Sequence, residues 1–386
     1  MVLQRHFELL ACLLGGITHA HTLPPPTGPY NAGLRPYILK HTTHNDPVAP
    51  NGTGTSVLVN LYYPTLHSAY PVRYLYQGLS TYYENYWKLP SSILYNVTAV
   101  INPGAEPLPP SVRASLPTLI FGPPFAGPDS IAFTSLLSDL ASYGYTIITI
   151  DHPYEQPFLE YPDGTGIPGL PVDVNATNEL VEAVLAYRYT DTSALLDVLP
   201  SIAKDWNDFP INLTHFVFFG HSVGGSAALS SAIIEQNRTI NGANINVLGA
   251  INLDGSNWDR VSANDSSANL AVPSLLLGSE LHSSTWDTTW SNFESQQTAW
   301  CKELQVAGTN HTDFSDIILW KQWFGISEPG EGIIESHRMA NLTRVFVRAF
   351  MDKVGRGTEG GVLSMDEWVK KEWPEVGTVF ENEATS

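Results

Sequence analysis

The sequence is poor in cysteine and in basic residues. Its 386 residues include two cysteines, and 19 lysines and arginines stand against 38 aspartates and glutamates, which gives a formal net charge of −19. So little cysteine excludes a disulfide-rich scaffold, and the fold must rest on a hydrophobic core. So little positive charge argues against binding to nucleic acid or to an anionic membrane surface.

Long apolar runs and biased segments are absent too. No stretch reaches the roughly 18 consecutive apolar residues of a membrane-spanning helix, and the chain has neither repeats nor low-complexity segments. Hydrophobic residues make up 43% and charged residues 15% of the chain, which excludes disorder, collagen and coiled coil. No glycine-rich phosphate loop or dinucleotide fingerprint occurs, and we predict no cofactor and no metal.

The first twenty residues have the pattern of a secretory signal. Arg5 precedes the apolar run 7–17, and small residues follow up to Ala20. This order predicts cleavage after Ala20 and a secreted protein. Cleavage would remove Cys12 and leave Cys301 without a partner for a disulfide within the chain. Eight Asn-X-Ser/Thr sequons are in keeping with secretion and glycosylation; they are Asn51, Asn96, Asn175, Asn212, Asn237, Asn264, Asn310 and Asn341.

Short continuous apolar runs alternate with helical patterns through the middle of the chain. Such runs are typical of strands buried on both faces, and the alternation is typical of βαβ units. The sequence therefore predicts an α/β fold with a mostly parallel central sheet and helices on both faces. We expect strands at 56–63, 118–121, 146–150, 216–219, 247–253 and 274–277, and helices at 130–142, 178–202, 224–236, 314–323 and 336–354.

We expect one folded domain with an extension at each end. Residues 1–20 form the predicted signal peptide, 21–50 an extended, Pro-rich lead-in, 51–355 the α/β domain, and 356–386 a Gly-rich, acidic and loosely attached tail. The aromatic segment 70–90 is either an insertion with a small core of its own or the lining of a lid or entrance.

The strongest motif is Gly-His-Ser-Val-Gly at residues 220–224. It follows the apolar run 216–219 and precedes a helical stretch, which is the strand–turn–helix context of a nucleophile elbow. The turn is so tight that side chains at its two glycine positions would collide with the neighbouring strand and helix. Such a turn lifts the Ser222 hydroxyl above the sheet edge, beside a helix N-terminus that favours developing negative charge. Ser222 is therefore the candidate nucleophile.

A serine nucleophile needs a base and an acid that orients the base. In this class of sheet the acid follows the serine in the chain and the histidine comes last. Asp254 ends the next apolar run and is the candidate acid, with Asp259 as the fallback. His311 lies in a late loop between an apolar run and a helix, and we prefer it as the base over His282 and His337.

An oxyanion hole needs two backbone N–H groups. One should belong to Val223, the residue after the nucleophile, and the other to the loop 121–127 after the first central strand. Pro123 and Pro124 have no N–H group. Phe125 is the first residue of the loop after them that is able to donate.

These motifs resemble those of the plasma-type platelet-activating-factor acetylhydrolases and their fungal relatives, a family of the α/β-hydrolase superfamily. The resemblance extends in the same order over about residues 56–320 and rests on Gly-His-Ser-Val-Gly-Gly at 220–225, Ile-Asn-Leu-Asp-Gly at 251–255, Gly-Thr-Asn-His-Thr-Asp-Phe-Ser-Asp at 308–316, and the stretches 61–64 and 121–154. It implies an α/β-hydrolase fold with 51–355 as the catalytic domain. It also implies a calcium-independent carboxylester hydrolase for short or oxidised acyl chains, often at the sn-2 position of a phospholipid.

The resemblance carries catalytic roles over to the same residues. It implies Ser222, Asp254 and His311 as the triad, and Val223 and Phe125 as the oxyanion donors. The implied partner is a small ester or phospholipid substrate. We also expect transient contact with a lipid surface, for which the aromatic segment 70–87 is the candidate. Three alternatives stay open. They are a general secreted esterase or polyesterase with the same triad, a non-catalytic hydrolase-like binding protein, and a peptidase or amidase on the same fold.

Overall fold

The computed structural model describes residues 21–109, 111, 115–172, 174–206, 209–327 and 332–382. The predicted signal peptide lies outside the described residues, so secretion stays a prediction. Within the described part of the chain, no helix has the length and apolar character needed to cross a membrane.

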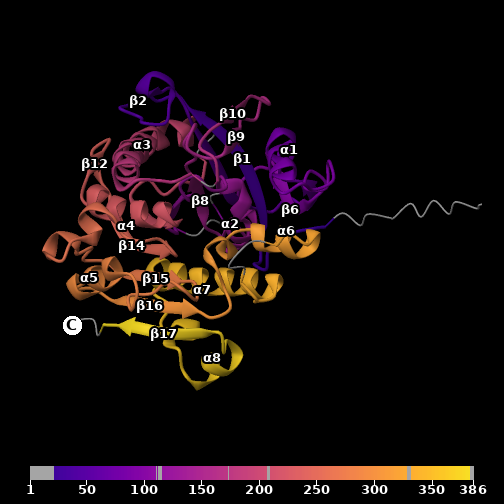
Figure 1. Cartoon of the computed structure of the whole chain (residues 1–386). Helices are drawn as coiled ribbons and strands as arrows, with labels where there is room; N and C mark the ends of the chain where they lie inside the picture. The colour runs from indigo at the N-terminus through magenta and orange to yellow at the C-terminus, as the bar shows by residue number, and fades with distance from the viewer. Residues whose placement is uncertain are drawn as a thin grey trace, which may run out of the picture.

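An 11-stranded sheet forms the centre of the molecule (Figure 1). Its strands are β1 (Asn31–Leu39), β4 (Val57–Thr65), β5 (Tyr70–Arg73), β6 (Thr98–Pro103), β7 (Thr118–Gly122), β8 (Thr146–Thr149), β11 (His215–His221), β14 (Asn246–Leu253), β15 (Ser274–Gly278), β16 (Cys301–Val306) and β17 (Val376–Glu381). The strand order is β17-β16-β15-β14-β11-β7-β8-β4-β1-β6-β5. The strands from β16 to β8 in this order are mutually parallel. Among the described residues, three short two-stranded sheets lie outside this sheet. They are β2 (Thr43–His44) with β3 (Thr53–Gly54), β9 (Phe158–Glu160) with β10 (Gly166–Pro168), and β12 (Thr239–Ile240) with β13 (Ala243–Asn244).

Helices cover both faces of this sheet. They are α1 (Gln77–Tyr86), α2 (Thr134–Ser142), α3 (Asn178–Asp205), α4 (Val223–Glu235), α5 (Thr288–Gln296), α6 (Ile317–Phe324), α7 (Ser336–Arg356) and α8 (Glu367–Glu372). Residues of α3, α4 and α5 share one buried cluster with the sheet, and residues of α1, α2, α6 and α7 share another.

Alternation along the central strands explains the continuous apolar runs. Phe121 and Phe219 belong to the cluster under α2 and α7, whereas Ile120 and Phe218 belong to the cluster under α3 and α4. Because side chains alternate between the faces of a strand and both faces are covered, each position must be apolar. The predicted α/β fold with a mostly parallel sheet is confirmed.

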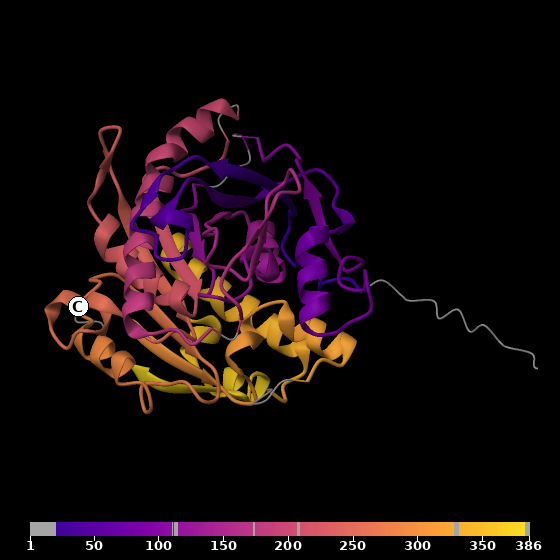
Figure 2. The ribbon, with the colours of Figure 1, turned by 45° about the horizontal axis from the view of Figure 1, so that its top comes forward.

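The sheet extends beyond both predicted ends of the α/β domain. β1 lies in the predicted lead-in 21–50, yet it pairs antiparallel with β4 and parallel with β6. β17 lies in the predicted tail 356–386 and pairs with β16. The extended lead-in is therefore part of the sheet, and the tail is attached to it through β17 rather than loosely. β17 is an edge strand, whereas β1 lies between β4 and β6. Both are held by backbone hydrogen bonds, which a polar sequence supplies as well as an apolar one. In Figure 2 the indigo strands of the N-terminal part and the yellow C-terminal strand lie on opposite sides of the molecule.

The aromatic segment 70–90 forms β5 and α1 and packs on the main core. Tyr74 and Tyr83 are buried in the same cluster as Trp320 of α6. The Trp320 indole Nε1–H donates to the Tyr74 hydroxyl at 2.8 Å. The segment therefore shares the main core and has no separate one.

The sequons differ in exposure. The side chain of Asn212 is half-buried, and its amide nitrogen donates to the Leu116 carbonyl at 3.1 Å. Asn310 is also half-buried and caps the turn that contains His311. The exposed sequon asparagines are Asn51, Asn96, Asn175, Asn237, Asn264 and Asn341. A glycan is attached at the amide nitrogen, so at Asn212 it would compete with the hydrogen bond to Leu116.

Two carboxyl groups are buried together between α5 and β16. Glu294 is 5% and Glu303 0% exposed. Burial raises the pKa of Glu294 to about 9, and the hydrogen bond to Glu303 and its negative charge act in the same direction. The pair therefore holds a proton at neutral pH.

Glu294→Gln should remove a pH dependence of stability. The folded protein keeps a proton on Glu294 that the unfolded chain releases above its ordinary pKa of 4.5. The free energy of unfolding therefore falls as pH rises from that value to about 9, by up to about 1.4 kcal/mol per pH unit. In thermal unfolding, the Tm of the variant relative to that of the wild type should be higher at pH 8.5 than at pH 5. An equal difference at both pH values would contradict the shared proton.

Candidate active site

Ser222 occupies the turn between β11 and α4. Its backbone lies at φ 59° and ψ −131°, a region that residues with a side chain rarely adopt. A Cβ on Gly220 would lie 2.3 Å from the Gly224 carbonyl oxygen, and one on Gly224 would lie 2.2 Å from the Gly122 carbonyl oxygen. Strand, turn and helix therefore approach so closely that both positions require glycine. The result is a strained turn that presents the Ser222 hydroxyl at the sheet edge.

The side chains of Ser222, Asp254 and His311 meet at the carboxyl ends of parallel strands. Ser222 follows β11, Asp254 follows β14, and His311 follows β16 at the start of the short helix η5 (His311–Phe314). His311 Nε2 lies 2.9 Å from Ser222 Oγ, and His311 Nδ1 lies 2.6 Å from Asp254 Oδ2. This array lets the imidazole take a proton from the hydroxyl while the carboxylate fixes its orientation.

Asp254 is buried but well supplied with donors. The carboxyl group accepts from the Ser279 N–H at 2.5 Å in addition to its contact with His311. Burial alone would raise the pKa of Asp254, but hydrogen bonds with His282 and His311 outweigh it and hold the pKa below its ordinary value. Asp254 is therefore ionised. The His311 side chain is 50% exposed, so a ligand can reach it from solvent.

His221 supports the loop that carries His311. Its Nε2 lies 2.7 Å from the His311 carbonyl oxygen, and the two rings are 4.6 Å apart. Burial, followed by the proximity of His311, lowers the pKa of His221 to about 3, so this imidazole is neutral and donates from Nε2. The motif analysis assigned no role to this residue.

The donor atoms of His221, Asp254 and His311 lie within 4.8 Å of one another, which is close enough for a metal ion. Both ring nitrogens of His311 and both oxygens of Asp254 already take part in hydrogen bonds or ion pairs. This donor set fits a proton-transfer array better than a metal site.

Of the three other candidates from the sequence, Asp259 and His337 lie apart from this array. Asp259 is exposed and accepts a hydrogen bond from the Tyr189 hydroxyl at 2.9 Å. His337 lies at the start of α7 with its ring 6.1 Å from that of Trp323. His282 does reach Asp254, on the oxygen opposite to the one that His311 contacts.

Arg188 of α3 anchors the start of the loop after β7. This buried guanidinium donates to the carbonyl oxygens of Pro123 and Pro124 at 2.8 and 3.3 Å and pairs with the carboxylate of Glu155. These carbonyls directly precede Phe125, the predicted oxyanion donor. Sequence analysis missed Arg188 because it lies 65 residues from Pro123 on a helix without a motif.

Asp151 anchors the other end of the same loop. Its carboxylate accepts from the backbone N–H of Ser130 at 2.7 Å and from the Ser130 hydroxyl. Phe125 lies between the two anchors, followed by Ala126 at φ 47°. Val223 is the first residue of α4, where a helix leaves its N–H groups without partners inside the helix. Both predicted oxyanion donors thus lie in backbone segments that are held in place.

No protein-family model matches the chain. In sequence the chain is similar to a probable 1-alkyl-2-acetylglycerophosphocholine esterase from Arthroderma benhamiae, with 27% identity over 276 residues that cover 64% of this chain and 63% of the relative. The chain thus matches less than two thirds of the length of this curated relative.

In structure the chain is similar to a ferulic acid esterase from Streptomyces cinnamoneus. The TM-score is 0.76 at 25% identity, and the match covers 94% of this chain and 100% of the esterase. Together with the mostly parallel sheet, this similarity shows that the chain has an α/β-hydrolase fold, and that the proteins it resembles in sequence and in structure are esterases.

Proposed function

We propose that the chain is a serine-dependent carboxylic ester hydrolase that cleaves short or oxidised acyl chains from the sn-2 position of glycerophospholipids such as 1-alkyl-2-acetylglycerophosphocholine. The observation that carries the proposal is the hydrogen-bonded array of Ser222, His311 and Asp254. The similarity to a probable 1-alkyl-2-acetylglycerophosphocholine esterase supports the choice of substrate.

Acylation begins with attack of Ser222 Oγ on the ester carbonyl carbon. His311 Nε2 takes the hydroxyl proton, and the ionised Asp254 stabilises the imidazolium that forms. The tetrahedral intermediate then expels the alcohol, which leaves with the proton from His311. The acyl group remains as an ester on Ser222.

Water completes the reaction by the same route. His311 takes a proton from a water molecule, whose oxygen attacks the acyl carbon. Collapse of the second tetrahedral intermediate releases the carboxylic acid and returns the proton to Ser222 Oγ. The strained turn at Ser222 keeps the hydroxyl accessible in both steps.

Two backbone N–H groups, of Val223 and Phe125, stabilise the oxyanion in this proposal. The hydrogen bonds from Arg188 to the carbonyls before Phe125 hold this part of the loop in position. An N–H group stabilises the oxyanion best when it is already aligned before negative charge develops on the carbonyl oxygen.

A second candidate function is hydrolysis of ferulic acid esters. The structural match to a ferulic acid esterase covers the whole length of that chain and supports this reading. It is one case of the general secreted esterase considered above, and it requires the same triad. A non-catalytic binding protein would have no need of the array, and its geometry argues against that alternative.

Hydrolysis of phosphatidylcholines with sn-2 chains from acetyl to palmitoyl tests the substrate, with Ser222→Ala as the blank. We expect a steep preference for acetyl and, in the blank, a fall in kcat on the order of 10⁶-fold, as in other serine hydrolases. Thermal unfolding of the blank should match the wild type.

Two other outcomes decide against parts of the proposal. Hydrolysis of a ferulate ester without phospholipid turnover would leave the triad assignment intact, but the proposed substrate would then be a ferulate ester and not a phospholipid. Full activity of Ser222→Ala on any ester would contradict the assignment of Ser222 as the nucleophile.

Arg188→Lys should reduce kcat by about 10- to 100-fold with little change in KM. Lysine keeps a positive charge beside Glu155 but lacks the planar fork that holds two carbonyls, so the N–H of Phe125 loses its alignment. Arg356→Lys is the matched control, because Arg356 is exposed and also bonds a carboxylate, that of Asp352, and a carbonyl. Equal effects of both variants on steady-state kinetics would argue against a role for Arg188 in the loop.

A further inference from the structure

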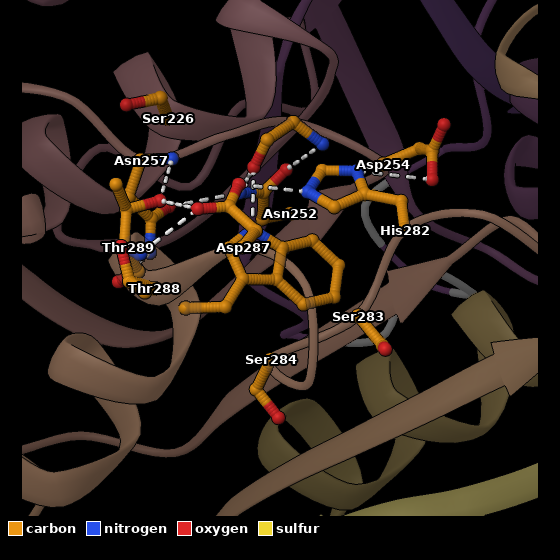
Figure 3. A network of polar contacts seen from close by, with 12 residues as sticks. Ser226, Asn252, Asp254, Asn257, His282, Ser283, Ser284, Asp287, Thr288 and Thr289 are labelled. Atoms are coloured by element: carbon orange, nitrogen blue, oxygen red, sulfur yellow. Dashed lines mark hydrogen bonds and ion pairs between the residues drawn. The ribbon is translucent and has the colours of Figure 1, made fainter.

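The carboxylate of Asp254 has a second histidine partner. His282 follows β15, and its Nδ1 lies 3.3 Å from Asp254 Oδ1, while His311 contacts Oδ2. The other ring nitrogen of His282, Nε2, lies 3.0 Å from Asp287 Oδ2. Figure 3 shows the imidazole of His282 between these two carboxyl groups.

Both ring nitrogens of His282 therefore face carboxylates and both must donate. An imidazole donates from both nitrogens only when it is protonated. Its side chain is 16% exposed, and burial alone would lower the pKa of His282, but the hydrogen bonds with Asp254 and Asp287 outweigh burial and raise the pKa to about 9. His282 is therefore an imidazolium ion across the neutral pH range.

The surroundings hold this ion in place. The ring of Trp290 lies 4.3 Å from that of His282 at 34°. Asp287 caps α5, and its Oδ1 accepts from the Thr289 N–H and hydroxyl at 2.8 and 2.6 Å. The Trp290 indole Nε1–H donates to the Gly255 carbonyl at 2.6 Å, one residue from Asp254. The cation thus keeps a fixed distance from the triad.

We propose that His282 is a positioning residue whose positive charge, held against Asp254, makes His311 harder to protonate and so keeps the site active in mildly acidic solution. This inference rests on the proposed function. The negative charge of Asp254 interacts with two histidines, so it stabilises the protonated form of His311 less than it would if His311 were its sole partner. The positive charge of His282 also repels a positive charge on His311. His311 must be unprotonated to act as the base.

Other titratable and charged groups near the two histidines are the same in the wild type and in the variants below. His221 from β11 is neutral at working pH, because its pKa is lowered to about 3. Further groups on the packed elements include Glu280, which accepts from the Gly308 N–H, and Glu303 on β16, which accepts from the Ser284 N–H and interacts with Glu294 on α5. They also include Asp313 on η5 and Lys321 on α6, which donates to the Thr312 hydroxyl. A difference between variants at position 282 therefore reports on the charge at that position.

The pH dependence of kcat/KM in His282→Gln tests the proposal. The acid limb, where activity falls because His311 becomes protonated, should move to higher pH by about one unit. The ratio of variant to wild-type kcat/KM should accordingly fall about tenfold between pH 8 and pH 5.5. An acid limb that coincides with that of the wild type would overturn the proposal.

Two control variants separate charge from structure. His282→Lys keeps a cation between the carboxylates, and its acid limb should stay near that of the wild type, whereas a purely structural role predicts that it behaves like His282→Gln. His215→Gln makes the same substitution at an exposed residue at the opposite end of β11, and should leave the profile unchanged. An equal shift in His282→Lys and His282→Gln would contradict the charge effect.

A measurement on the unmodified protein covers the case in which the glutamine variant does not fold. Nitrogen NMR of protein with ¹⁵N-labelled histidine should show, at pH 7.5, an imidazole protonated at both nitrogens that is missing in His282→Lys. A neutral His282 at this pH would overturn the proposal. Loss of activity in Ser222→Ala under the same conditions shows that such a failure concerns His282 and not the proposed function.

Discussion

The buried carboxylate of Asp254 is the constraint on which the rest of the site depends. A charge that is 2% exposed would be very unfavourable without compensation. Compensation comes from the Ser279 N–H, His311 and His282, which follow β15 and β16. The parallel register of these strands with β14 is what brings the donors to one point. The chemistry of the site is therefore a consequence of how the sheet is paired.

Backbone strain is concentrated at the same place. Ser222 and Asp254 both have positive φ, at 59° and 57°. Tight packing keeps them there, since the Ser222 N–H donates to the Leu253 carbonyl at 2.8 Å and a Cβ on Gly255 would lie 2.0 Å from the Ser222 carbonyl oxygen. Each strained residue costs of the order of 1–3 kcal/mol, which the large core on both faces of the sheet must offset. As a result, the Ser222 hydroxyl and the Asp254 carboxylate are held in fixed positions before any ligand binds.

Those parts of the fold and site that follow from local patterns could be predicted from the sequence. Continuous apolar runs indicated the central strands, and the glycine spacing around Ser222 indicated the turn. Asp254 and His311 could be selected as candidates because each follows a strand in the expected order, and the structure brings both side chains together with Ser222. β1 and β17 were missed because neither sequence forms a continuous apolar run, although β1 lies inside the sheet and β17 at its edge. Arg188 was missed, and His282 was considered only as a base, because their contacts join segments far apart in the chain.

Labelling with diisopropyl fluorophosphate tests the central claim most directly, since this reagent phosphorylates an activated serine with loss of fluoride. Peptide mapping by mass spectrometry should find one diisopropylphosphoryl group per chain, on Ser222, formed in step with the loss of esterase activity. The modification should be far slower in His311→Gln. Labelling of another serine, or full activity in protein labelled at Ser222, would contradict the assignment of Ser222, His311 and Asp254 as the catalytic array.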